Sequence, residues 1–448
     1  MLGVLFVALG VGLSIGLHEI GHLVPAKKFG VKVTQYMVGF GPTLWSRRGG
    51  ETEYGLKAIP LGGYIRMIGM FPPRPGDVPG TVRVSSTGRF SQLADEARQL
   101  SLEEIRPGDE NRVFYKLSVP KKVVVMMGGP LMNLLIAVVL LGGLVTLYGI
   151  PVPKDGALVA AVSECVVPAS QAASKTECAP SDPKTPAYAA GLRPGDKVIS
   201  VAGEPIKRTV DVGNIIRPRV GQATEIVVER DGARQTLTAT PIRNQVQRVS
   251  EDGQPMVDAD GNPVVVEAGF LGISSATPTV LERQPVTVVP SVVWQGLKLT
   301  AGVVLRIPEK MAGVAQAAFG SGERDPEGPI SVVGVGRIAG EVSSGSIEGL
   351  ADSNAAKFAF LIQLLASLNL ALFVFNMIPL LPLDGGHVAG ALWEGLKRQT
   401  ARLLGRPDPG HVDVAKALPV AYAVSSVLIV MSVLLIYADI VKPIQLGG

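Results

Sequence analysis

Two histidines and a glutamate near the start of the chain have the types and spacing of a metal-dependent hydrolase. His18 and His22 flank Glu19 in the pattern His-Glu-x-x-His. Residues four apart on a helix project from one face, so both imidazoles can reach one Zn²⁺ ion at about 2.0–2.1 Å. Glu19 then lies beside the metal as a general base. The pattern predicts hydrolysis by a zinc-activated water.

The sequence around the motif has the character of a membrane span. Between Met1 and Leu23, Glu19 is the only residue with a formal charge. Ionisable groups are costly in lipid and mark functional sites there. The stretch has no basic residue before its apolar part and no small-residue cleavage site. We therefore expect a retained transmembrane helix over residues 1–24 rather than a signal peptide.

The rest of the 448 residues alternates between apolar blocks and sequence of soluble type. Charged residues make up only 18%, and a net charge of +4 gives no indication of a nucleic-acid partner. Three further blocks without a charge are long enough to span a bilayer: Val123–Ile150, Phe358–Leu383 and Leu418–Ala438. These blocks predict transmembrane helices over residues 123–150, 357–384 and 417–441.

A fifth apolar stretch, Val286–Leu305, contains Lys298 and Pro290. If exactly one span separates the first helix from the span that ends at Asp384, those two helices run in the same direction. The histidines and Asp384 then share one face of the membrane. We therefore predict that this stretch lies on the membrane surface or packs against the core, within a segment over residues 281–356.

Charge orients the predicted helices. Residues 25–122 are rich in Lys and Arg, whereas acids outnumber bases in residues 151–356. The positive-inside rule places residues 25–122 in the cytoplasm, together with a second loop over residues 385–416. Both termini are then expected outside.

Asp384 is the strongest candidate for the third metal ligand that a catalytic zinc requires. It follows Pro379 and Pro382, which cannot lie in a regular helix interior, so the span must break here. Irregular backbone at membrane depth is tolerated where protein or a water-filled cavity covers it. We expect this break to line the active site.

The two motifs together resemble those of the site-2 protease family of intramembrane zinc metalloproteases. Gly128–Asn133 and residues 102–122 resemble further parts of its actinobacterial members. The resemblance implies one Zn²⁺ held by His18, His22 and Asp384, with Glu19 as the base. It also implies that substrate is positioned by Asn133, Asn376, Pro379 and Pro382.

The resemblance further implies a polytopic α-helical protein of the bacterial plasma membrane. The expected fold has four transmembrane helices, a membrane-associated β-hairpin and an extracytoplasmic PDZ domain (α+β). The implied activity is cleavage, within the lipid bilayer, of single-span membrane proteins already trimmed outside, such as anti-sigma factors, in regulated intramembrane proteolysis. One alternative is a catalytically inactive, membrane-anchored PDZ scaffold. A metal-ion transporter is another, but it leaves Glu19 unexplained.

The predicted hairpin lies in the first cytoplasmic segment. Thr52–Ile59 alternates in polarity, Gly62-Gly63 is a turn signal, and Tyr64–Met70 can return as a second strand. The resemblance implies a re-entrant hairpin whose free edge, around Tyr54 and Leu56, binds the extended substrate. An ordinary cytoplasmic hairpin is the alternative.

The segment over residues 151–280 contains the PDZ resemblance. Pro186–Ile206 is similar to the bacterial PDZ signature, and Asp231-Gly232 predicts a turn between strands Thr224–Arg230 and Gln235–Pro241. A short helix is expected over Asp211–Ile216. Gly269–Ile273 either supplies amides for a peptide carboxylate or is the strand that leaves the domain. The domain acts either as a size filter for substrates or as a passive spacer.

Cys165 and Cys178 lie in this same segment, on the predicted exterior side. A disulfide between them would close a short loop, and two free thiols are the alternative. Ser321–Gly328 is polar and Gly-rich and is expected to be a linker. His387 and His411 are expected to face solvent or to support the site without binding the metal.

Overall fold

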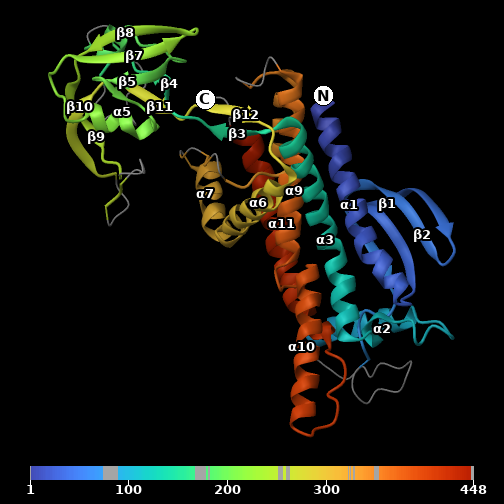
Figure 1. Cartoon of the computed structure of the whole chain (residues 1–448). Coiled ribbons are helices and arrows are strands. Elements are labelled where there is room, and N and C mark those ends of the chain that lie inside the picture. The colour runs from blue at the N-terminus through green and yellow to red at the C-terminus, as the bar shows by residue number, and fades with distance from the viewer. Residues whose placement is uncertain are drawn as a thin grey trace. The chain divides into compact units, whose positions relative to one another are not determined.

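The computed structural model describes residues 2–73, 89–166, 178–179, 182–250, 256–258, 263–320, 322, 324–325, 328–347 and 353–444. The chain divides into two compact units (Figure 1). The first unit comprises Met1–Tyr148 and Gln284–Gly448, and the second comprises Gly149–Arg283. The first unit contains the long helices and the His-Glu-x-x-His motif.

Five helices of the first unit, within the described residues, are long and apolar enough to cross a membrane. They are α1 (Leu2–Lys28), α3 (Val119–Gly143, continued by the π-helical turn Leu144–Tyr148), α6 (Val289–Leu305), α9 (Asn354–Asn376) and α11 (Leu418–Val441). Helices therefore occupy each of the four predicted spans, and α6 occupies the fifth apolar stretch. This result rests on length and composition.

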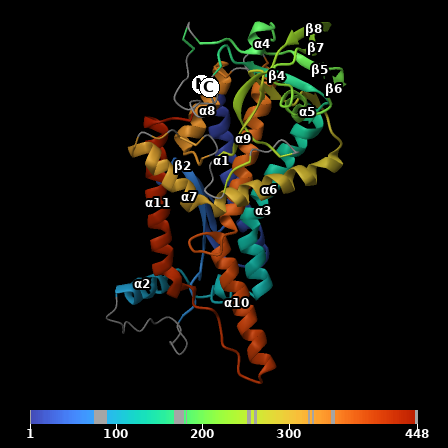
Figure 2. The ribbon, with the colours of Figure 1, turned by 90° about the vertical axis from the view of Figure 1, so that its left-hand side faces the viewer.

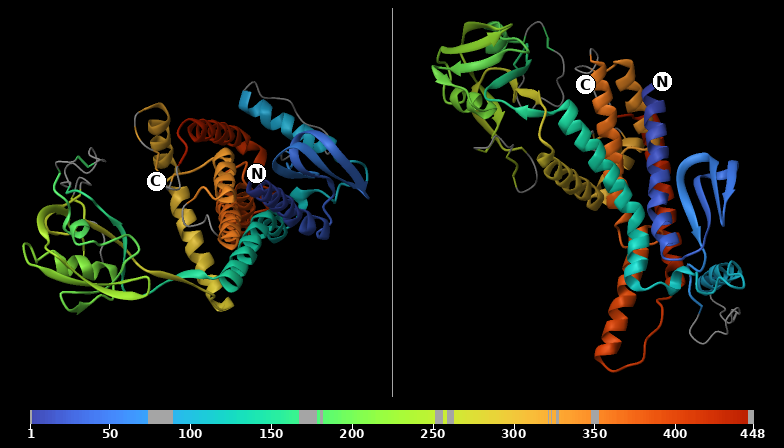
Figure 3. Two further views of the ribbon diagram at one scale, coloured as in Figure 1. Left: turned by 90° about the horizontal axis from the view of Figure 1, so that it is seen from above. Right: turned by 45° about the vertical axis from the view of Figure 1, so that its right-hand side comes forward.

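Small residues let α1 pack closely against both α3 and α9. A Cβ atom on Gly21 would overlap the carbonyl group of Gly128 on α3. On the other side, Asn369 of α9 donates a 3.0 Å hydrogen bond to Ser14. Such contacts hold helices together in lipid, where the hydrophobic effect between helices is absent. Figure 3 shows α9 (orange) lying among its neighbours, and it contacts α1, α3 and α6.

The contacts also fix the helix directions. Gly10 lies against Leu365, and Ser14 lies against Asn369, so residue numbers on α1 and α9 rise together. The two helices run in the same direction. Along α3 the numbers run the opposite way, because Gly21 faces Gly128 while His18 contacts Asn133.

The predicted break between two helices is confirmed. α9 ends at Asn376, and α10 (Asp384–Leu403) begins at Asp384. A Cβ atom on Gly386 would come within 2.6 Å of the Leu381 amide nitrogen, so only glycine allows the tight turn. The predicted loop over residues 385–416 needs correction, because α10 fills its first half. That helix is amphipathic and gives no hydropathy signal.

A buried ion pair fixes α10 to α3. Lys122 Nζ lies 2.8 Å from one carboxylate oxygen of Glu394 and 3.0 Å from the other, and these side chains are 6% and 2% exposed. Val412 donates its amide hydrogen to the same carboxylate, and His411 Nδ1 lies 3.3 Å from it. Burial raises the pKa of Glu394, but the hydrogen bonds from His411 and Lys122 prevail and lower it to about 2. His411 thus supports this pair rather than the metal.

The described part of segment 281–356 is largely helical, which the predicted membrane-surface segment and linker did not include. α6 lies across α3 and α9 at a steep angle (Figure 2), and Gly296 packs against Leu370. It is followed by α7 (Ile307–Phe319) and α8 (Val332–Ser344). A buried ion pair of 2.7 Å between Arg324 and Asp439 ties the connection between them to α11. The rest of the predicted linker Ser321–Gly328 lies mostly outside the described residues.

The sheet of the first unit differs from the predicted hairpin. β1 (Val33–Gly49) and β2 (Thr52–Met67) are joined by a tight turn at Gly50, and not at Gly62-Gly63. Tyr36 pairs with both Tyr54 and Ile65, so the first part of β1 lies between two parts of β2. A second glycine pair, Gly49-Gly50, provides the turn that the prediction assigned to the later pair. A sequence that alternates in polarity does not reveal which of two glycine pairs forms the turn between its strands.

The prediction of a free sheet edge around Tyr54 and Leu56 is therefore wrong. Tyr54 and Leu56 each have a partner on both sides, because Tyr54 also pairs with Arg47 and Leu56 also pairs with Trp45. Their backbone groups are inside the sheet and cannot receive another strand. Within the described residues, the open edges are Thr43–Gly49 and Gly63–Met67.

The second unit is built on a six-stranded sheet with the order β11-β4-β5-β7-β8, with β6 paired to β5. The strands are β4 (Ala157–Val162), β5 (Lys197–Val201), β6 (Glu204–Pro205), β7 (Thr224–Arg230), β8 (Ala233–Ala239) and β11 (Ile273–Ala276). Asp231 and Gly232 turn between β7 and β8 with φ of 51° and 78°, as the Asp-Gly signal predicts. α4 (Pro186–Ala189) and α5 (Thr209–Ile216) pack against the sheet core, and α5 begins two residues before the predicted helix.

Two small strand pairs complete this unit: β3 (Ile150–Pro153) with β12 (Thr279–Glu282), and β9 (Ile242–Gln247) with β10 (Val265–Phe270). Within the stretch Gly269–Ile273, the backbone amide of Gly269 donates a hydrogen bond to the Arg217 carbonyl. Cys165 and Cys178 form a disulfide, with their Cα atoms 5.8 Å apart. Residues 167–177 between them lie outside the described residues.

The ion pair between α3 and α10 generates a stability prediction. Lys122→Met leaves the Glu394 carboxylate buried without its lysine, which should lower the free energy of unfolding by about 3–5 kcal/mol. The double variant Lys122→Met/Glu394→Leu should recover most of that loss. Thermal and chemical unfolding of the purified protein in detergent measures both changes.

The exposed pair Arg112–Glu51 is the matched control, because its side chains are 38% and 34% exposed. Arg112→Met should change stability by less than about 1 kcal/mol. A double variant as unstable as Lys122→Met would contradict this account of the pair.

Candidate metal centre

The structure brings together the three predicted metal ligands. His18 Nε2 and His22 Nε2 lie 3.2 Å apart, and each lies 3.4 Å from Asp384 Oδ2. Ligand atoms about 2.0–2.1 Å from a tetrahedral zinc are separated by about 3.3–3.4 Å. The three donors therefore fit a zinc ion, and their nitrogen and oxygen chemistry suits it. They are the one group of this kind among the described residues.

Each histidine is oriented through its second nitrogen. His22 Nδ1 donates a 2.7 Å hydrogen bond to the Val125 carbonyl, which turns Nε2 toward the site. The Asn133 amide lies 3.1 Å from His18 Nδ1, and Asn133 is only 1% exposed. A neutral His18 that ligates through Nε2 carries its hydrogen on Nδ1, so it needs the amide oxygen as acceptor. The structure thus places Asn133 against a ligand.

Gly129 makes room for the ligand nitrogens. A Cβ atom there would lie 2.7 Å from His18 Nε2 and would overlap His22 Nε2. Glycine is therefore required because of the metal site itself. The sequence contained the signal, a glycine pair inside an apolar helix, but only the structure shows what the pair faces.

Glu19 is buried beside the ligands, with 7% of its surface exposed. Its carboxylate accepts a hydrogen bond from the backbone amide of Ile65 on β2. Gly63 on the same strand is also close, since a Cβ atom there would lie 2.9 Å from Glu19 Cγ. The open edge Gly63–Met67 therefore contacts the candidate base. Sequence reasoning missed this contact, because it assigned the edge to the other part of β2.

The remaining predicted site residues lie on α9, on its connection to α10 and on β2. Asn376 is the last residue of α9, and the exposed Pro379 and Pro382 shape the connection to α10. The Tyr54 hydroxyl accepts a 2.8 Å hydrogen bond from Lys27, and Leu56 is 50% exposed. Among the described residues, no hydrogen bond or ion pair links Tyr54 or Leu56 to His18, His22 or Asp384. His387, on the first turn of α10, is likewise outside the ligand group.

Known proteins are similar in sequence to this chain over nearly its whole length. Residues 6–404 match the model of peptidase family M50. The zinc metalloprotease Rip1 of Mycobacterium tuberculosis is 33% identical over 449 aligned positions, which cover 99% of this chain and 98% of the relative. Rip1 of Mycolicibacterium smegmatis is 32% identical with the same coverage. The metalloprotease MmpA of Caulobacter vibrioides is 26% identical over 87% of this chain and 85% of its own length.

The apolar helices and the ligand set, with these relatives, define a zinc metalloendopeptidase of a membrane. Such an enzyme acts on membrane proteins in a lipid bilayer. The chain belongs to peptidase family M50.

Gly129 provides a test of the metal site. Gly129→Ala should displace the ligand nitrogens and weaken zinc affinity by about 10–100-fold, with a parallel loss of activity. Zinc content after dialysis against graded chelator concentrations measures the effect. Gly143→Ala on the same helix is the control, because a Cβ atom there meets nothing within 4 Å. Unchanged zinc affinity in Gly129→Ala would show that the pocket does not hold the metal.

Proposed function

We propose that this protein is an intramembrane zinc endopeptidase that cleaves the transmembrane segments of single-span proteins in regulated intramembrane proteolysis. Anti-sigma factors are the expected substrate class. The observation that carries the proposal is the position of the ligands. His18 and His22 lie on α1, and Asp384 follows α9, and both helices have the length and composition of membrane spans. The bond to be cleaved must reach that depth.

The helix directions support a topology of four membrane spans. α1 and α9 run in the same direction and α3 runs in the opposite one, so the chain between α3 and α9 begins and ends on one side of the membrane. A single crossing by α6 would reverse α9, and α7, with 13 residues, is too short to restore it. The inclination of α6 relative to α3 and α9 supports the same topology (Figure 2). The basic residues 25–122 then lie in the cytoplasm, and the second unit lies outside the plasma membrane.

The chain's own residues prepare the reaction. His18, His22 and Asp384 would hold a zinc ion, which would supply a bound water of lowered pKa and an electrophile for the peptide carbonyl. Glu19 receives the proton, and the Ile65 amide fixes the orientation of its carboxylate. The Val125 carbonyl and the Asn133 amide keep both imidazoles turned toward the site. Burial of Glu19 and Asn133 excludes bulk water from these contacts.

The sheet edge supplies an extended binding site. A helical substrate hides its carbonyl groups in hydrogen bonds and must unwind before cleavage. Gly63–Met67 is an open edge that touches Glu19, so a substrate strand paired with it lies next to the base. We assign substrate binding to this edge in place of the one around Tyr54 and Leu56.

In this proposal the second unit is a PDZ domain outside the membrane. Its β7–β8 hairpin, α5 and the Pro186–Ile206 segment match the expected elements. It would exclude substrates that still carry bulky exterior domains, which fits prior trimming by another protease. An inactive scaffold is not favoured, because the ligand set and the base are complete.

Replacement of the base tests the chemistry. Glu19→Gln should retain zinc and lose cleavage of a membrane-embedded reporter by at least about 10²–10⁴-fold, because the amide cannot accept the proton. His22→Ala should lose both zinc and cleavage. Zinc analysis and reporter cleavage are measured on the same preparations. Undiminished cleavage by Glu19→Gln would refute the mechanism.

Photo-crosslinking tests the substrate edge. In the Glu19→Gln enzyme, p-benzoylphenylalanine at Tyr64, on the edge that touches the base, should crosslink to bound substrate. The same group at Trp45, on the opposite edge, is the matched control and should not. Crosslinks from Trp45 alone would assign the substrate to the other side of the sheet.

A further inference from the structure

Tyr36 joins the sheet of the first unit to the helix that carries the candidate base. It lies in the first part of β1, and its side-chain hydroxyl donates a 2.8 Å hydrogen bond to the Gly16 carbonyl on α1. Gly16 precedes Glu19 by about one helical turn. The Tyr36 side chain is half-buried, and its ring centroid lies 5.7 Å from that of Tyr54 on β2. The hydroxyl is therefore held on the backbone of α1.

The helix is shaped to receive this hydroxyl. A carbonyl oxygen has two lone pairs, so Gly16 can accept a hydrogen bond from Tyr36 as well as the one within the helix. A Cβ atom on Gly16 would lie 3.2 Å from the Tyr36 hydroxyl oxygen, which is a tight contact. A Cβ atom on Gly12, one turn earlier, meets nothing within 4 Å. The glycine at position 16 thus matches Tyr36, whereas the glycine at position 12 has no such neighbour.

Tyr36 is also the strand partner of the residue that touches the base. It pairs with Ile65 in the sheet, and the Ile65 amide donates a hydrogen bond to the Glu19 carboxylate. Two paired residues therefore contact α1 at two points about one turn apart. Backbone hydrogen bonds make paired strands move together. The position of Tyr36 on the helix consequently determines where the Ile65 amide lies.

We propose that Tyr36 is a positioning residue for the base. Its hydrogen bond to Gly16 holds the sheet in the place where the Ile65 amide orients the Glu19 carboxylate. Without the hydroxyl, β1 and β2 keep their own pairing, but the sheet loses one of these two contacts with α1. The inference deepens the proposed function, because it rests on Glu19 being the base of that reaction.

Steady-state kinetics of the full-length enzyme in lipid nanodiscs measure the effect on a membrane-embedded reporter that has no exterior domain. Tyr36→Phe removes only the hydroxyl. It should lower kcat about tenfold and keep the zinc content, with KM within about twofold of the wild type, because a misplaced base weakens the transition state and not substrate binding.

The other end of the hydrogen bond provides a second variant with a matched control. Gly16→Ala crowds the hydroxyl and should give part of the same loss in kcat. The double variant Tyr36→Phe/Gly16→Ala should lose no more than Tyr36→Phe alone, since both changes act on one contact. Gly12→Ala adds the same methyl group to α1 where space is open, so it should cleave as the wild type does.

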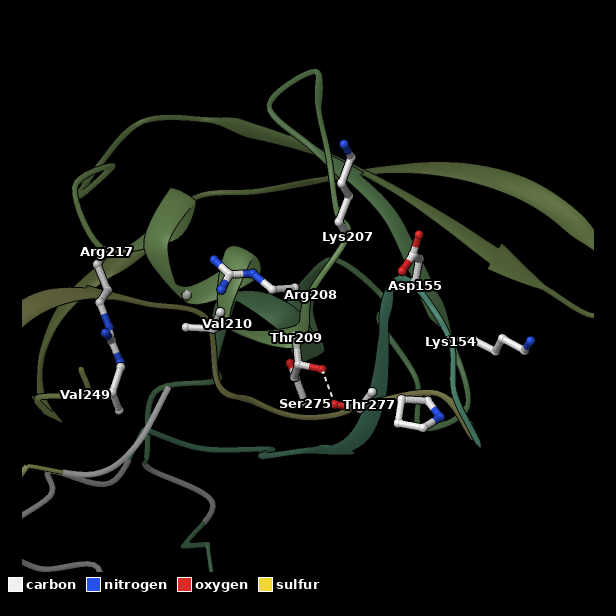
Figure 4. A pocket seen from close by; sticks show the side chains of 12 residues that line it. Lys154, Asp155, Lys207, Arg208, Thr209, Val210, Arg217, Val249, Ser275 and Thr277 are labelled. Carbon is white, nitrogen blue, oxygen red and sulfur yellow. Dashed lines mark hydrogen bonds between the residues drawn. The ribbon is translucent and has the colours of Figure 1, made fainter. Parts of the chain in front are cut away.

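Amide hydrogen exchange, measured by mass spectrometry, tests the same contact without any cleavage. In Tyr36→Phe the peptide that contains Ile65 should exchange about tenfold faster, because its amide spends time away from Glu19. Two controls each remove a hydroxyl hydrogen bond that does not involve α1. Thr34→Val removes one to Arg66 within the sheet, and Thr209→Val removes one to Thr277 in the second unit (Figure 4). Both should exchange and cleave as the wild type does.

Three results would each overturn the inference. They are an unchanged kcat in Tyr36→Phe, an equal loss of kcat in Gly12→Ala or Thr34→Val, and unchanged exchange at Ile65. Because the exchange measurement needs no cleavage, failure of this inference is distinguishable from failure of the proposed mechanism, which Glu19→Gln tests. Unfolding midpoints show that each variant is folded.

Discussion

The close approach of α1 and α3 is the constraint on which the rest of the structure depends. Gly21 and Gly128 bring the two backbones into contact, and Gly129 then leaves space for both ligand nitrogens. Only at this separation do Val125 and Asn133 reach the imidazoles. In lipid no hydrophobic force compensates for a poor fit between helices, so the missing side chains at these glycines determine the geometry of the metal site.

The other ligand and the base are attached to this helix pair by separate devices. The Ser14–Asn369 hydrogen bond aligns α9 with α1, and the Lys122–Glu394 pair holds α10 against α3, so Asp384 is fixed from both sides. The sheet contributes the Ile65 amide to Glu19 from a third direction. Rigid elements thus hold every group that takes part in the proposed chemistry.

The sequence predicted well that His18, His22 and Asp384 come together and that a helix breaks before Asp384, because spacing and backbone chemistry act locally there. Residues four apart on a helix must share a face, and Pro379 and Pro382 must end a helix wherever they occur. The sequence-based prediction failed where the fold depends on which strands pair with each other. The alternating polarity of Thr52–Ile59 is the same in an edge strand and an inner strand, and two glycine pairs compete as the turn. The amphipathic α10 was missed because mean hydropathy is blind to a helix that is polar on one side.

The origin of the ligands has a consequence for biosynthesis. His22 and Asp384 are separated by about 360 residues. At a translation rate of roughly 5–20 residues per second, the two histidines exist for about 20–70 seconds before the ribosome makes their third partner. During that interval the nascent chain holds half a site and no protease. With the proposed ligand set, proteolytic capacity would appear only after the chain that carries Asp384 has been made.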